Sequence, residues 1–174
     1  MRFLIGGGLA NAGRSVVLLI ALCACATTAW ADPPKGYPFL SYDQGLARAQ
    51  AQHKRIFLYF GRYGCGWCAK TNKETFSDAA LRKRYIDHYV LVYVDAESGR
   101  RLTLPSGERI TEMELGARFN VFATPMFVYL ESNGTPIFKA PGYKTVKDFT
   151  DFDRYVQGGY YKREPLLQFL KGAS

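Results

Sequence analysis

Residues 56–68 read IFLYFGRYGCGWC, a short apolar run that leads within a few positions to two cysteines. The length and aromatic content of the run predict a buried strand over 55–60. A helix is predicted to follow through about Glu74, so Cys65 and Cys68 lie at its beginning. Unpaired backbone N–H groups and the helix dipole favour a thiolate at such a position. The stretch therefore predicts a dithiol that can close to a disulfide and reopen with little backbone movement.

The two thiols are predicted to have different roles in thiol–disulfide exchange. Cys65 is nearer the helix start, so we expect it to be the more exposed thiol and the attacking nucleophile. Cys68, one turn further along, is expected to resolve the mixed disulfide by attacking Cys65. The same spacing is also half of a zinc site, which would need His53 and His88 to complete it. Because these histidines are isolated and lack ligand-like spacing, we expect no metal and no bound cofactor.

The first 31 residues have the pattern of a secretory signal peptide. Arg2 and Arg14 supply positive charge, an apolar stretch follows, and residues 29–31 form a small-x-small cleavage site. We therefore expect an exported chain with one domain over residues 32–174. Two alternatives stay open, an uncleaved N-terminal anchor and lipid attachment at Cys25.

A purely structural disulfide is a poor explanation for the cysteine pair. Residues 32–174 contain no cysteine besides Cys65 and Cys68. A bridge between them closes a very small loop, which constrains the unfolded chain little and adds little stability. A reactive pair is the better interpretation.

The charge pattern gives no sign of a nucleic-acid partner. The formal net charge of the full chain is +8. The basic residues are scattered along the chain, as is typical of solvated faces, and no nucleic-acid-reading motif accompanies them.

The remaining sequence predicts an α/β domain with a central mixed sheet and helices on both faces. Ser41 and Gln44 have the spacing of a capping box that opens the first helix. A polar insert over 97–110 is predicted to form a hairpin, and a second hairpin is predicted around residues 132–135. A short helix over 166–171 is expected to dock on the domain as a C-terminal extension.

The sequence resembles the thioredoxin superfamily. The resemblance rests on the strand over 56–60, the motif Cys65-Gly66-Trp67-Cys68, the step Ala123-Thr124-Pro125 before a strand, the hairpin at Asn133-Gly134, and Pro141-Gly142-Tyr143. Within the superfamily, the long polar insert, the Ala-Thr-Pro step and the aromatic tail over 155–161 are similar to exported proteins of the SoxW type. The segment over 75–78 is also similar to the C-terminal domain of the DsbD reductases.

The resemblance implies roles for the residues around the cysteines. Pro125 corresponds to the superfamily's cis-proline, which leaves the backbone of Thr124 available to pair with an extended substrate chain. Trp67 would contact a partner or cover the disulfide, the alternative being simple packing against Tyr63. Gly66 would keep the approach to the first cysteine open.

Two departures from the superfamily pattern bear on the chemistry. Many thioredoxins have a buried aspartate six residues before the first cysteine, where this chain has Tyr59, a poor base near neutral pH. Glu74 or water would have to take the place of that proton acceptor. The chain also lacks the histidine between the cysteines that makes some members strongly oxidising.

Together these features predict a periplasmic thiol–disulfide oxidoreductase, monomeric, that reduces protein disulfides through Cys65 and Cys68. The resemblance implies a membrane thiol reductase of the DsbD or CcdA type as electron donor. The alternatives are a disulfide oxidase or isomerase, and a non-catalytic thioredoxin-fold binding module.

Overall fold

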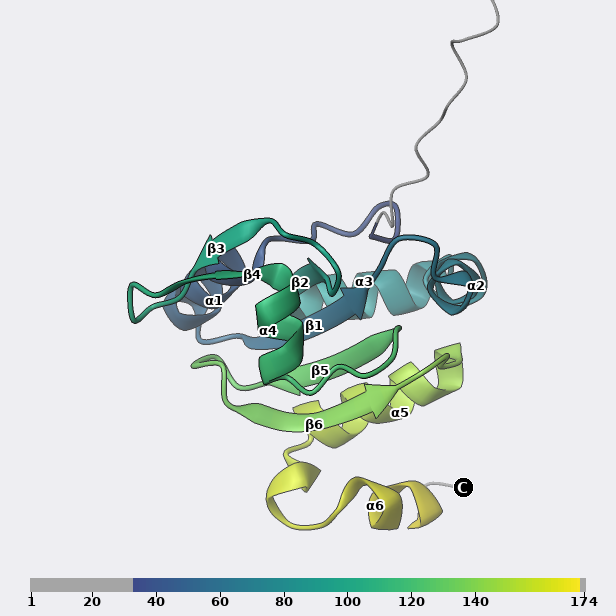
Figure 1. Cartoon of the computed structure of the whole chain (residues 1–174). Coiled ribbons are helices and arrows are strands. Elements are labelled where there is room, and N and C mark those ends of the chain that lie inside the picture. The colour runs from purple at the N-terminus through teal and green to yellow at the C-terminus, as the bar shows by residue number, and fades with distance from the viewer. Residues whose placement is uncertain (1–32, 173–174) are drawn as a thin grey trace, which may run out of the picture.

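A mixed four-stranded sheet forms the centre of residues 33–172, the part of the chain that the computed structural model describes (Figure 1). The strand order is β2-β1-β5-β6, where β1 is Arg55–Gly61, β2 Tyr89–Asp95, β5 Met126–Leu130 and β6 Pro136–Pro141. β1 is parallel to β2 and antiparallel to β5, and β5 is antiparallel to β6. The mixed sheet is the one that the sequence predicted. The predicted signal peptide over 1–31 and Cys25 lie outside the described residues.

Helices cover both faces of the sheet (Figure 1). One face packs against α1 (Tyr42–Gln52), α4 (Glu112–Arg118) and the insert hairpin of β3 (Arg101–Thr103) and β4 (Arg109–Thr111). The other face packs against α2 (Gly66–Glu74), α3 (Ala79–His88) and α5 (Val146–Gln157). Within residues 33–172, none of the helices has the length and hydrophobicity that a membrane span requires.

The two faces of the sheet have different cores because side chains alternate along each strand. On β1, Ile56 and Leu58 point into an aliphatic core under α1 and α4. Phe57 and Tyr59 point to the opposite face, into an aromatic core under α3 and α5. All four side chains are fully buried. Both cysteines belong to the aromatic core, so the end of β1 that leads to them rests on packed rings.

Residue spacing predicts a capping box at two helix starts, and the structure forms one of these two boxes. Thr111 and Glu114 form the reciprocal capping box that their spacing predicts for α4. The predicted box at Ser41 is wrong, because Ser41 makes no side-chain cap bond. Its hydroxyl instead donates to the carboxylate of Asp43 in the first turn of α1, and it accepts no N–H of the helix.

The C-terminal extension docks on the domain at the end of β1 that is far from the cysteines. It consists of the short 3-10 helix η1 (Tyr160–Lys162) and α6 (Leu166–Gly172). Arg55, at the start of β1, donates hydrogen bonds to Gln157 and to the hydroxyl of Tyr161. Phe169 of α6 packs on Tyr155 of α5, with ring centroids 5.3 Å apart. The predicted docking of this helix is confirmed.

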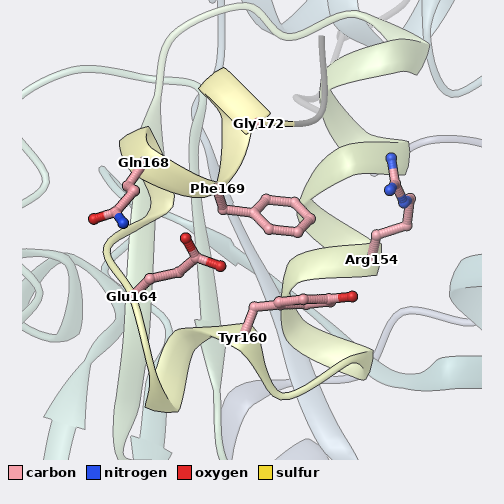
Figure 2. Close-up of a pocket in the computed structure, with 6 residues that line it drawn as sticks. All are labelled: Arg154, Tyr160, Glu164, Gln168, Phe169 and Gly172. Atoms are coloured by element: carbon pink, nitrogen blue, oxygen red, sulfur yellow. The ribbon is translucent and has the colours of Figure 1, made fainter.

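A small pocket opens between α5 and the extension (Figure 2). Its volume is about 250 Å³, and Figure 2 shows the ring of Phe169 pointing into the space between α6 and the helix that carries Arg154. Its lining residues are Arg154, Tyr160, Glu164, Gln168, Phe169 and Gly172. Since Arg55 anchors the extension at the opposite end of β1, this pocket is separate from the cysteine pair.

Candidate active site

The cysteines stand at the junction between β1 and α2. After β1 ends at Gly61, a short loop leads to Cys65, and Gly64 in that loop has a φ of +67°, a conformation that glycine adopts easily. Cys65 is the N-cap residue of α2, and its sulfur accepts the backbone N–H of Cys68 at 3.1 Å. The two cysteines form a disulfide with their Cα atoms 5.2 Å apart. The first turn of α2 therefore fixes the position of both cysteines.

Both cysteines are mostly covered by their surroundings. Cys65 is 8% exposed and Cys68 is 5% exposed. The expected order is correct, but the expected openness of Cys65 is not, because its side chain is packed against the aromatic core and the loop before β5. Only a small part of the Cys65 side chain is thus accessible to a partner.

The loop between α4 and β5 lies directly against the first cysteine. The Thr124–Pro125 peptide bond is cis, the isomer that the resemblance implies. The carbonyl oxygen of Thr124 is 3.4 Å from the sulfur of Cys65, although the two residues are 59 positions apart. The hydroxyl Oγ1 of Thr124 is buried, and it has no hydrogen-bond partner among residues 33–172. The tertiary fold thus brings the Cys65–Cys68 motif and the Thr124–Pro125 step together.

Trp67 is exposed beside the disulfide and held from one side. Its side chain is 59% exposed, as is that of Tyr63, so packing between these two rings does not bury either of them. Lys70 places its ammonium 5.3 Å from the ring centroid of Trp67 and 4.8 Å from that of Tyr143. This cation–π arrangement fixes Trp67 on the outer side of α2. The sequence pattern did not indicate the contact, since Tyr143 is on a distant loop.

The fold and this geometry agree with the comparison to known families. Residues 42–157 match the family model described as a thioredoxin-like domain. The chain belongs to the thioredoxin superfamily. A thioredoxin-like fold that presents a Cys65–Cys68 pair supports thiol–disulfide oxidoreductase chemistry in general.

Individual relatives of this thioredoxin-like chain are distant. The disulfide bond reductase DsbH of Chlamydia pneumoniae is 28% identical over 98 residues, which cover 54% of this chain and 56% of that protein. The chain thus spans little more than half of that relative. A thioredoxin-fold protein from Helicobacter pylori has a TM-score of 0.60 at 23% identity, covering 70% of this chain and 82% of that one. A Thermus thermophilus thioredoxin has a TM-score of 0.57 at 24% identity, covering 69% and 86%. These two structures establish the fold alone.

Tyr59 occupies the position under the dithiol where many thioredoxins have aspartate. It is fully buried, and its hydroxyl donates to Oδ1 of Asn72 at 3.3 Å. Burial, with a smaller effect from Tyr93, raises the pKa of Tyr59 well above its usual range. Tyr59 is therefore a neutral hydrogen-bonding group and not a proton acceptor. Asn72 was missed from the sequence, although its place one helical turn after Cys68 was a usable signal.

Glu74 is not brought to the cysteines. It follows Cys68 by six positions on α2, which places the two side chains on different faces of the helix. Its carboxylate accepts a hydrogen bond from the hydroxyl of Tyr143 at 3.0 Å and lies 3.9 Å from the ammonium of Lys70. Of the two substitutes for the missing aspartate, water is the one compatible with these contacts.

Substitution of Tyr59 by phenylalanine tests its neutral role. We expect the pH dependence of disulfide reduction to stay unchanged, because the raised pKa keeps the Tyr59 hydroxyl protonated throughout the neutral range. Loss of the hydrogen bond to Asn72 should lower the free energy of unfolding by about 1 kcal/mol. Insulin reduction followed from acid to alkaline pH, with denaturant unfolding of both proteins, measures the two effects. A shifted pH profile in the variant would show that Tyr59 takes part in proton transfer.

The histidines considered for a metal site lie elsewhere. His53 ends α1, and Nδ1 of His88 is 2.8 Å from Oδ1 of Asp153. Within the described part of the chain, no group of three or more His, Cys, Asp or Glu side chains is arranged to hold a metal ion. The cysteine sulfurs are joined to each other, and the sulfur of Cys65 lies against the carbonyl of Thr124.

Proposed function

We propose that this protein is a periplasmic thiol–disulfide oxidoreductase that reduces disulfides in other proteins. The observation that carries the proposal is the Cys65–Cys68 pair at the N-terminus of α2, facing the Thr124–Pro125 step. An N-terminal helix position stabilises a thiolate, and the N–H of Cys68 already points at the sulfur of Cys65. Cys65 is therefore the proposed nucleophile.

The proposed reaction has two steps that balance in sulfur and electrons. The Cys65 thiolate attacks one sulfur of the target disulfide, the target S–S bond breaks, and the other target sulfur leaves as a thiolate. The Cys68 thiolate then attacks Cys65, which forms the Cys65–Cys68 disulfide and releases the target as a dithiol. Two electrons have passed to the target. An upstream dithiol reductase, proposed to be of the DsbD or CcdA membrane type, must return them.

The residues around the cysteines support access for a protein substrate. A Cβ atom added at Gly66 would meet nothing within 4 Å, which is consistent with an open approach beside Cys65. Trp67 presents an exposed ring for partner contact. We propose that an extended target segment pairs with the backbone of Thr124, next to the sulfur that it exchanges with.

Different observations support the proposed direction of electron flow and the proposed location of the protein. The name of the Chlamydia pneumoniae relative, a disulfide bond reductase, favours reduction as the physiological direction. The absence of histidine between Cys65 and Cys68 argues in the same direction. Export to the periplasm is proposed from the signal-peptide pattern over 1–31.

The reduction potential of the pair tests the proposed direction. We expect a value nearer that of thioredoxin, about −270 mV, than that of the oxidant DsbA, about −120 mV. Equilibration of residues 32–174 with glutathione or dithiothreitol buffers, followed by mass spectrometry of alkylated protein, measures it. Catalysed insulin reduction with dithiothreitol should accompany the low value. A potential near −120 mV would favour the oxidase or isomerase alternative, and a pair that does not cycle would favour the binding module.

A further inference from the structure

Exposed apolar side chains gather around the disulfide. Of the five large hydrophobic residues that are exposed within residues 33–172, three belong to the segments around the cysteines: Tyr63 in the loop before Cys65, Trp67 in the first turn of α2, and Phe122 in the loop before β5. We call these three, Tyr63, Trp67 and Phe122, the aromatic rim. Phe122 is 91% exposed, the most of any of the five. Clustered exposed apolar groups on a soluble domain usually mark a contact surface.

Phe122 is held close to the reactive sulfur by its chain neighbours. Val121 packs against the aliphatic core, and its N–H donates to the carbonyl of Gly116. Two residues after Phe122, the carbonyl of Thr124 touches the sulfur of Cys65. Phe122 is therefore carried on a short segment fixed at both ends, and its Cα lies within about 7 Å of the Cα of Thr124.

Two cations next to the rim have acidic partners. Arg62 lies 3.6 Å from Glu97, and Lys70 lies 3.9 Å from Glu74. Lys70 is in addition held over the rings of Trp67 and Tyr143. The rim itself offers exposed aromatic area beside these paired charges. An aromatic surface of this kind fits an apolar side chain of a partner.

We propose that Phe122 is a specificity-determining residue that receives a bulky apolar side chain of the target protein. A target cysteine joined to Cys65 lies beside Thr124, so an extended target segment places the residue two positions away next to Phe122. The proposal rests on the proposed function and names its substrate class: extended segments in which a bulky apolar residue lies two positions from the disulfide-bonded cysteine.

Two matched peptides test the proposal. Each is a heptapeptide whose central cysteine forms a mixed disulfide with thionitrobenzoate, and both positions two residues away carry either leucine or serine. The release of thionitrobenzoate by the reduced protein, residues 32–174, gives kcat/KM for each peptide. We expect kcat/KM to be about tenfold higher for the leucine peptide, mainly because its KM is lower. A tenfold difference is the size expected when binding partly buries one aromatic side chain.

Variants then assign the preference to the rim. Phe122→Ser should lower kcat/KM for the leucine peptide about tenfold more than kcat/KM for the serine peptide and so remove the preference, and Phe122→Leu should keep most of it. The matched control is Leu167→Ser on α6, which removes another exposed apolar side chain, 74% exposed, and should change neither rate. Circular dichroism verifies that each variant is folded.

The outcomes separate this inference from the proposed function. An equal loss of kcat/KM with both peptides in Phe122→Ser would overturn the role of Phe122, and so would the absence of a preference in the unaltered protein. Either result would leave the reductase assignment intact. If the unaltered protein reduces neither peptide nor insulin, the proposed function itself fails and the inference falls with it.

Discussion

Replacement of Cys65 by serine is expected to lower disulfide reduction to the uncatalysed rate. A serine hydroxyl is not deprotonated near neutral pH and forms no stable bond with a disulfide sulfur, so the first exchange step cannot occur. The fold should survive, because Cys65 is the N-cap of α2 and serine is among the preferred N-cap residues. Insulin reduction with dithiothreitol, together with a thermal melt, measures both expectations.

The matched variant Cys68→Ser distinguishes the two cysteines. It keeps the attacking thiol and removes the resolving one, so we expect one turnover that stops at a mixed disulfide between Cys65 and the target. Mass spectrometry should detect this adduct in Cys68→Ser and not in Cys65→Ser. Full reductase activity in Cys65→Ser would refute the assignment of the nucleophile.

Replacement of Phe57 by alanine is expected to cost the most stability. Phe57 is fully buried at the centre of the aromatic core, with its ring centroid 4.9 Å from that of Tyr85 and 5.4 Å from that of Tyr129. Loss of a buried phenylalanine ring and the resulting cavity should lower the free energy of unfolding by about 3–5 kcal/mol. For a domain of this size the melting temperature should fall by roughly 10–20 °C.

Phe122→Ala is the matched control for this measurement. The same substitution at a side chain that is 91% exposed removes almost no buried area, so we expect a change below about 0.5 kcal/mol. Denaturant unfolding of both variants followed by circular dichroism gives the comparison. A small effect at Phe57 would show that the aromatic core tolerates a cavity by collapsing around it.

Local patterns predicted the elements well. The aromatic run before the cysteines forms β1 within one residue of its predicted end, and the Thr111–Glu114 spacing forms its capping box. These features depend on neighbours only a few positions apart, so their physical causes are present in short stretches of sequence. The Ser41 box is wrong at this same scale, since the Ser41 hydroxyl donates to Asp43 and makes no cap bond with the helix.

Contacts between distant segments could not be predicted in the same way. Glu74 was a candidate proton acceptor by proximity in sequence, but the turn of α2 carries it to Tyr143 and away from Cys68. The contact between Lys70 and the rings of Trp67 and Tyr143 joins two elements far apart in the chain. The high exposure of Phe122 likewise depends on how the loop before β5 leaves the aliphatic core.

The sequence by itself determined the order of strands and helices along the chain and the cysteine pair at the start of α2, because each follows from periodicity or spacing within one segment. The superfamily was indicated by the resemblance of several motifs to known proteins. Only the tertiary structure decided how far Cys65 is covered, which groups surround it, and which side chains are left for a partner. Those properties arise when the loop at Thr124 meets the start of α2, 59 residues away in the chain. Packing between such segments depends on the whole fold and leaves no local pattern in the sequence.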